Sequence, residues 1–141
     1  MNDRVFFDSN ILIYAFGPVE VRKSLLSQRL ILEGAASQNA VVSYQVLQEF
    51  LNVAFKKFQP PVTVDVAREY LDEIVADLEI VPWSSALLKS ALLVRGRYQL
   101  SWYDSLIVAA ALEAGCEILY TEDLQHGQVV DGLTIRNPFI S

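Results

Sequence analysis

Short apolar segments, rich in β-branched and aromatic residues, recur along the chain between longer stretches whose apolar residues repeat every three to four positions. The first kind of segment is typical of buried strands and the second of helices with one packed face. Strands are predicted at 5–7, 40–43, 79–83, 117–123 and 133–137. Helices are predicted at 11–16, 20–37, 45–57, 63–77, 85–94 and 101–115, the last of them ending at a natural C-terminal glycine, Gly115. Because strands that alternate with helices form right-handed βαβ units, the sequence predicts an α/β fold with a mostly parallel sheet.

The composition limits the size and the class of the protein. With 141 residues, 52% of them hydrophobic, and with no repeat, low-complexity tract or flexible linker, the chain is predicted to form one domain over residues 1–141. Apolar runs fall short of the roughly 20 residues that span a bilayer, and the first residues do not resemble a signal peptide. We therefore expect a cytoplasmic protein without a membrane segment. The net charge of -6 argues against bulk neutralisation of nucleic-acid phosphates.

Cysteine and histidine are too scarce for several kinds of chemistry. Cys116 is the only cysteine in the sequence, so we expect a buried, inert thiol and no structural zinc site. His126 is the only histidine, and it is predicted to lie on a loop. A Ser-His-Asp set would require His126, so covalent nucleophilic catalysis is disfavoured.

An acidic residue interrupts the first apolar stretch, VFFDSNILIYAF (5–16). Asp8 follows the predicted strand and precedes the predicted helix, where Asp8 or Asn10 can cap the helix by accepting from a free backbone N–H group. The same position is the carboxyl end of a strand, which is the edge where open α/β sheets bind ligands. This stretch alone leaves both interpretations open.

Three further acids, Glu49, Asp104 and Asp123, occupy comparable places. Two of these acids also have purely structural explanations. Asp104 can belong to a capping box with Ser101 at the start of its helix, and Asp123 can belong to an ordinary turn. Glu49 lies next to the apolar face of its predicted helix, where a carboxylate needs an arginine or a metal ion as partner. If these acids converge with Asp8, their repulsion raises some of their pKa values unless cations neutralise them. An all-oxygen site favours Mg²⁺ or Mn²⁺.

Three segments taken together resemble the PIN-domain ribonucleases, and within that family the small VapC-like toxins of bacterial toxin–antitoxin pairs. The segments are FFDSNILIYAF, SYQVLQEFLNV and SWYDSLIVAAALEAGCEILYTEDLQHG. The resemblance implies a doubly wound α/β fold and the hydrolysis of RNA. It implies that Mg²⁺ or Mn²⁺ is held by Asp8, Glu49, Asp104 and Asp123.

The same resemblance has implications for supporting residues and partners. Asn10 and Thr121 match polar positions that support the metal site, while Glu122 is an alternative to Asp123 as the fourth ligand. A homodimer is expected, together with a cognate antitoxin protein whose tail occupies the groove.

Two other functions are compatible with parts of the pattern. A haloacid-dehalogenase-like phosphatase would use Asp8 as nucleophile, but it needs a second aspartate two residues later, where Asn10 stands. A non-catalytic PIN-like interaction module would keep the acids and only bind a partner. Chelator-sensitive cleavage of RNA would exclude the binding module, and a trapped aspartyl-phosphate would favour the phosphatase.

A basic turn, RGRY (95–98), is predicted just upstream of Asp104, and the glycine within it lets the turn bend. We expect Arg95 and Arg97 to form a rim that binds the RNA backbone, with Lys56 and Lys57 as the next candidates. Tyr98 and Trp102 either offer faces for unstacked bases or lie in the core.

Overall fold

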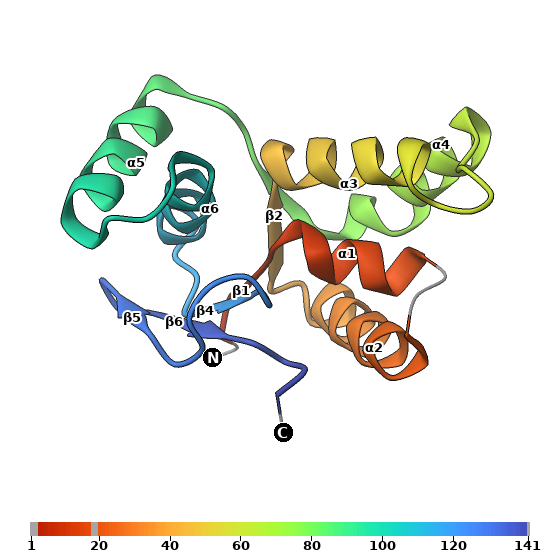
Figure 1. Cartoon of the computed structure of the whole chain (residues 1–141), viewed down its shortest axis with the longest axis horizontal. Helices are drawn as coiled ribbons and strands as arrows, with labels where there is room; N and C mark the ends of the chain where they lie inside the picture. The colour runs from red at the N-terminus through yellow and green to blue at the C-terminus, as the bar shows by residue number, and fades with distance from the viewer. Residues whose placement is uncertain (1–2, 18–19, 141) are drawn as a thin grey trace.

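The computed structural model describes residues 3–17 and 20–140, and it consists of a twisted sheet with helices on both sides (Figure 1). The strands are β1 (Val5–Phe7), β2 (Ala40–Ser43), β3 (Glu79–Val81), β4 (Ile118–Tyr120), β5 (Val129–Val130) and β6 (Leu133–Arg136). The helices are α1 (Ser9–Phe16), α2 (Val21–Ser37), α3 (Tyr44–Lys56), α4 (Val64–Glu73), the 3₁₀ turn η1 (Val75–Asp77), α5 (Ser85–Tyr98) and α6 (Trp102–Glu113).

The strands follow the spatial order β3-β2-β1-β4-β6-β5. All neighbouring pairs are parallel except β5 and β6, so the predicted mostly parallel sheet is confirmed. The chain moves outward in one direction from β1 to β2 and β3, and β4 lies on the other side of β1. The point where the strand order reverses is therefore between β1 and β4, and open α/β sheets bind ligands outside the strand ends at this point.

The hydrophobic core lies between the sheet and its helices. In Figure 1, α5 and α6 lie on one side of β2 and α1 to α4 lie on the other. The helix α6 is buried along Ser105–Ala111, and it is apolar on almost every face, as expected for a helix enclosed by the sheet and by α5. In the described ranges, no helix combines the length and the apolar character that crossing a membrane requires.

Several local predictions differ from the structure. The strands predicted at 79–83 and 117–123 are shorter, because they end at Val81 and Tyr120. The helix predicted over 63–77 divides into α4 and η1, and the short strand β5 was not predicted because two residues give no periodic signal. The predicted basic turn is wrong: α5 continues through Gly96 to Tyr98 and ends at Gln99, whose left-handed φ of 58° closes the helix. Packing of α5 against α6 offsets the roughly 1 kcal/mol by which glycine disfavours a helix interior.

Candidate metal and active site

Asp8 lies at the carboxyl end of β1, and the two oxygens of its carboxylate have different hydrogen-bond partners. Its Oδ1 accepts from the backbone N–H of Ser9 at 2.7 Å, which caps α1. Its Oδ2 accepts from the Thr121 hydroxyl at 2.9 Å, across the point where the strand order reverses. The residue is only 5% exposed. Capping and a functional carboxylate are therefore compatible at this position.

A polar network holds the segment that follows β4 against α1. The Asn10 side-chain amide donates to Thr121 Oγ1 at 3.3 Å and to Asp123 Oδ2 at 3.1 Å. The backbone N–H of Asp123 also donates to Thr121 Oγ1, at 3.1 Å. Since Thr121 is fully buried and linked to Asp8, Asn10 and Asp123, it connects the two strand ends. The structure thus brings together Asn10 and Thr121, which the sequence analysis named as support.

Glu49 and Asp104 approach the same place from two helices. Glu49 is half-buried on α3, whose first turn is capped by the Ser43 hydroxyl. Asp104 lies in the first turn of α6, and its backbone N–H donates to the Ser101 hydroxyl at 3.1 Å. The predicted Ser101 cap is therefore confirmed.

The electrostatics show that the four acids share one region. Burial is the main cause that raises the pKa of Asp8 to about 6, and the charges of Asp123 and Asp104 raise it further, against hydrogen bonds from Ser9 and Thr121 that lower it. Burial also raises the pKa of Glu49 to about 7, with contributions from Asp8, Asp104 and Asp123. Carboxylates that repel one another in a partly buried place favour a bound cation.

The donor atoms fit a hard divalent ion. Glu49 Oε1 and Asn10 Oδ1 are buried and have no hydrogen-bond partner among the described residues. Within the described ranges, no three acidic, histidine or cysteine side chains lie close enough together to hold a metal ion. Oxygen donors of this kind suit Mg²⁺ better than zinc, because Mg²⁺ prefers oxygen ligands and keeps several of its water molecules.

The raised pKa values predict how the metal-free protein responds to pH. Asp8 and Glu49 bind protons more tightly in the folded chain than in the unfolded chain, so their contribution to stability is complete near pH 4 and is lost as the pH rises to about 7. For Asp8 the loss is on the order of 3 kcal/mol; half-buried Glu49 contributes less. Urea unfolding with a chelator at pH 4 and pH 7.5 measures most of this difference.

The control for this measurement is a double variant, Asp8→Asn with Glu49→Gln, which lacks both titrating groups. Its free energy of unfolding is expected to change much less between the two pH values. An equal change in the double variant would show that other groups cause the pH dependence.

Glu122 turns away from the four acids, which the sequence did not reveal. It pairs with Lys23 at 2.9 Å and accepts a hydrogen bond from the Tyr14 hydroxyl. Lys23 also lies over the Tyr14 ring, at 4.9 Å from its centroid. These contacts occupy Glu122 and leave Asp123 on the side of Asn10. Lys23 could not be found from sequence, because it lies 99 residues from Glu122.

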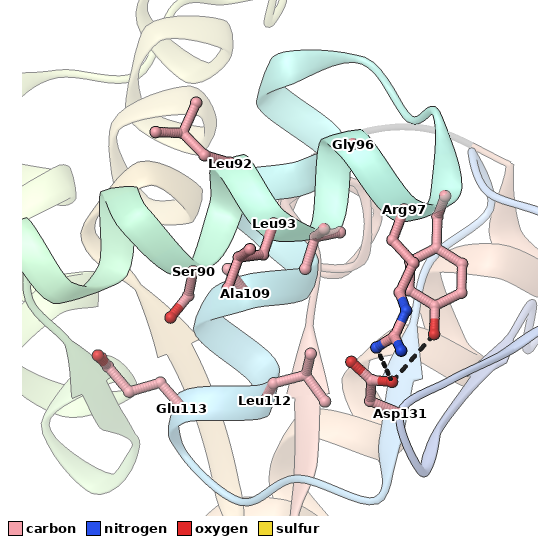
Figure 2. Close-up of a pocket in the computed structure, with 11 residues that line it drawn as sticks. Ser90, Leu92, Leu93, Gly96, Arg97, Ala109, Leu112, Glu113 and Asp131 are labelled. Atoms are coloured by element: carbon pink, nitrogen blue, oxygen red, sulfur yellow. Dashed lines mark hydrogen bonds and ion pairs between the residues drawn. The ribbon is translucent and has the colours of Figure 1, made fainter.

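The two arginines of the predicted rim lie on the last turns of α5. Arg95 donates to the backbone carbonyl of Leu100 at 2.6 Å. Figure 2 shows Arg97 turned toward Asp131, with which it forms an ion pair at 3.3 Å. Tyr98 also donates to Asp131, at 3.0 Å, and it is partly buried against the core, as is Trp102. The structure therefore favours the core alternative for both aromatic residues.

The lone histidine and the lone cysteine behave as the sequence suggested. His126 is exposed on the loop after β4, where its Nδ1 accepts from the backbone N–H of Asn137 at 2.9 Å. Cys116 is buried, and burial raises the pKa of its thiol to about 12. Neither residue belongs to the cluster of acids.

Comparisons with known proteins agree with this architecture. The family model described as PIN domain matches residues 5–131, and no match is found among curated proteins. A toxin–antitoxin complex from Klebsiella pneumoniae aligns with a TM-score of 0.70 and 19% identity, over 96% of this chain and 98% of that chain. VapC20 from Mycobacterium tuberculosis, a sarcin-ricin loop cleaving toxin, aligns with a TM-score of 0.63 and 16% identity, over 84% and 91%. DNA-bound VapBC from Salmonella typhimurium aligns with a TM-score of 0.67 and 15% identity, over 97% and 99%. The predicted doubly wound α/β fold is thereby confirmed.

Proposed function

Because the chain belongs to the PIN-domain family, we propose that it is a metal-dependent endoribonuclease and the toxin of a toxin–antitoxin system. The observation that supports this proposal is that the charges of Asp104 and Asp123 act on both Asp8 and Glu49, near the point where the strand order reverses. The solved structures with this fold include a toxin–antitoxin complex and a sarcin-ricin loop cleaving toxin.

The chain's own residues supply binding and orientation. Asp8, fixed by Ser9 and Thr121, presents a buried carboxylate that hardly needs to reorganise when a cation binds. Glu49, which shares this region with Asp8, Asp104 and Asp123, would help to hold the ion and to orient the attacking water. A bound Mg²⁺ or Mn²⁺ supplies Lewis-acid activation of the water and stabilisation of the leaving oxygen.

Incubation of the purified chain with single-stranded RNA, with Mg²⁺ or Mn²⁺ and then with a chelator, tests the function. We expect cleavage that requires the ion. Binding without cleavage would favour the interaction module, and turnover of a phosphomonoester through an aspartyl-phosphate would favour the phosphatase. In this proposal the protein acts in the cytoplasm, on RNA.

The antitoxin partner has a candidate surface on α2. Val21, Leu25 and Leu32 are exposed on one face of this helix. Beside them lies a cavity of about 280 Å³ that includes Leu32 and Tyr70. Most of the side chains that line this cavity are apolar, among them Phe16, Ile31 and Ile74, so an apolar segment fits this place. The cognate antitoxin supplies that segment in this proposal.

The homodimer has a separate candidate surface on α5. Leu88, Leu92 and Leu93 are exposed there, and Figure 2 shows Leu92 and Leu93 on the helix above α6. An open cavity of about 770 Å³ lies between α5, α6 and Asp131, and none of the four acids lines it. Burial of these leucines against a second copy would remove exposed apolar surface. Sedimentation of the wild type and of Leu93→Glu tests whether this surface forms the dimer.

Replacement of Arg95 and Arg97 by alanine tests the predicted RNA rim. If both arginines contact phosphates, the variant binds RNA more weakly. The slope of the logarithm of its binding constant against the logarithm of salt concentration becomes shallower by roughly 0.7 for each lost contact. Binding titrations across salt concentrations measure the slope. An unchanged slope would show that Arg95 and Arg97 do not contact the RNA, as expected if Asp131 already pairs with Arg97. Lys56 and Lys57 would then be the next candidates for the RNA-binding rim.

A further inference from the structure

Exposed aromatic side chains are rare in the described part of the chain and are unevenly distributed. Four of them are exposed: Tyr44, Phe55, Trp83 and Tyr103. Tyr44 is 46% exposed, Trp83 43% and Tyr103 67%, and these three lie around one edge of the sheet. Phe55 lies apart from them, in the last turn of α3.

The topology places the three aromatic residues beside the four acids. Tyr44 directly follows β2, and Trp83 comes two residues after β3, whose Val81 pairs with Ser43 of β2. Tyr44 and Trp83 line the same narrow gap, which is too small for a water molecule, so the two residues lie close together. The carboxyl edge of the sheet is therefore aromatic over β3 and β2 and acidic over β1 and β4.

Tyr103 connects the aromatic and the acidic parts of this edge. It immediately precedes Asp104 in the first turn of α6. Its backbone carbonyl accepts from the buried Gln45 side chain at 3.2 Å, which fixes α6 to the start of α3 next to Tyr44. With strands about 4.8 Å apart, β3 lies roughly 10 Å from β1. That distance is within reach of a short single strand whose phosphate lies at the acids.

We propose that Tyr44, Trp83 and Tyr103 form a stacking platform for unpaired bases of the RNA next to the cleaved phosphodiester. This inference rests on the proposed function, and it names single-stranded RNA as the form of substrate that the site accepts. Aromatic faces bind bases of any sequence by stacking, and this is the usual way in which proteins hold unstacked RNA. The platform also explains how an acidic chain holds RNA with few basic residues at the site.

A fluorescence titration tests the platform directly. The chain has two tryptophans, so Trp102→Phe leaves Trp83 as the only tryptophan fluorophore. The titration combines this change with Asp8→Asn, and the resulting variant is expected not to cleave the RNA. Single-stranded RNA is expected to quench the fluorescence of Trp83 until the binding site is saturated. An RNA of the same length with abasic positions is expected to quench little. Equal quenching by both RNAs, or none by either, would overturn the proposal.

Binding affinity gives a second test with a matched control. Trp83→Leu and Tyr103→Leu are each expected to weaken RNA binding about tenfold, and Trp83→Tyr to restore most of it. Phe55→Leu, which removes the exposed aromatic ring outside the platform, is expected to leave affinity unchanged. If the wild type cleaves RNA and these variants bind as tightly as it does, the platform is wrong while the nuclease function stands. If the wild type neither binds nor cleaves RNA, both proposals fail.

Discussion

Asp8→Asn and Asp104→Asn are each expected to abolish RNA cleavage while the fold stays intact. Loss of residues that only support a metal ligand costs about 10- to 100-fold, so loss of a ligand is expected to exceed a hundredfold. The amide that replaces the Asp8 carboxylate keeps an oxygen that can accept from the Ser9 N–H group, and the change at Asp104 leaves untouched the backbone N–H that Ser101 caps. Without metal, both variants are expected to be as stable as the wild type or more stable, because one of the repelling carboxylates is gone.

Cleavage rates with Mg²⁺ and melting temperatures with a chelator measure these two effects. Asp72→Asn, the same change on the exposed surface of α4, is the matched control and should cleave at the wild-type rate. Wild-type cleavage by either site variant would remove that residue from the metal centre. A large loss of melting temperature would instead show that the carboxylate is needed for folding.

Mg²⁺ or Mn²⁺ is expected to raise the thermal stability of the wild type. An ion that binds only the folded chain stabilises it by about 2.7 kcal/mol at a hundred times its dissociation constant. In a chain of this length that corresponds to a rise in melting temperature on the order of 10 °C. Thermal unfolding at increasing ion concentration measures this rise.

Two variants separate specific binding from general screening. Asp123→Asn should reduce the rise, whereas Glu122→Gln should keep it, because Glu122 is held by Lys23 and Tyr14 rather than directed at the other acids. If Glu122→Gln loses the rise and Asp123→Asn keeps it, the fourth ligand is Glu122. An equal rise in Asp8→Asn and in the wild type would point to nonspecific screening of charge.

The sequence by itself determined the elements and the acids that end them. The period of two or of 3.6 residues in the apolar pattern is a local property, so it predicted β1, β2 and α6 closely. The cap of Ser101 and the left-handed glycine at Gly115 are also local, and both were predicted. The same local signals failed where they conflicted with packing, as in the last turn of α5, where Gly96 was expected to allow a bend.

The tertiary structure alone decided which way the side chains turn. Glu122 and Asp123 are adjacent, and the sequence left both as candidates for the fourth metal ligand. In the structure, Lys23, which is 99 residues from Glu122, pairs with Glu122, while Asp123 accepts from Asn10. The base-stacking candidates from the sequence, Tyr98 and Trp102, pack against the core. The exposed aromatic residues near this edge of the sheet are instead Tyr44, Trp83 and Tyr103. These outcomes depend on contacts between distant segments, and local periodicity carries no information about such contacts.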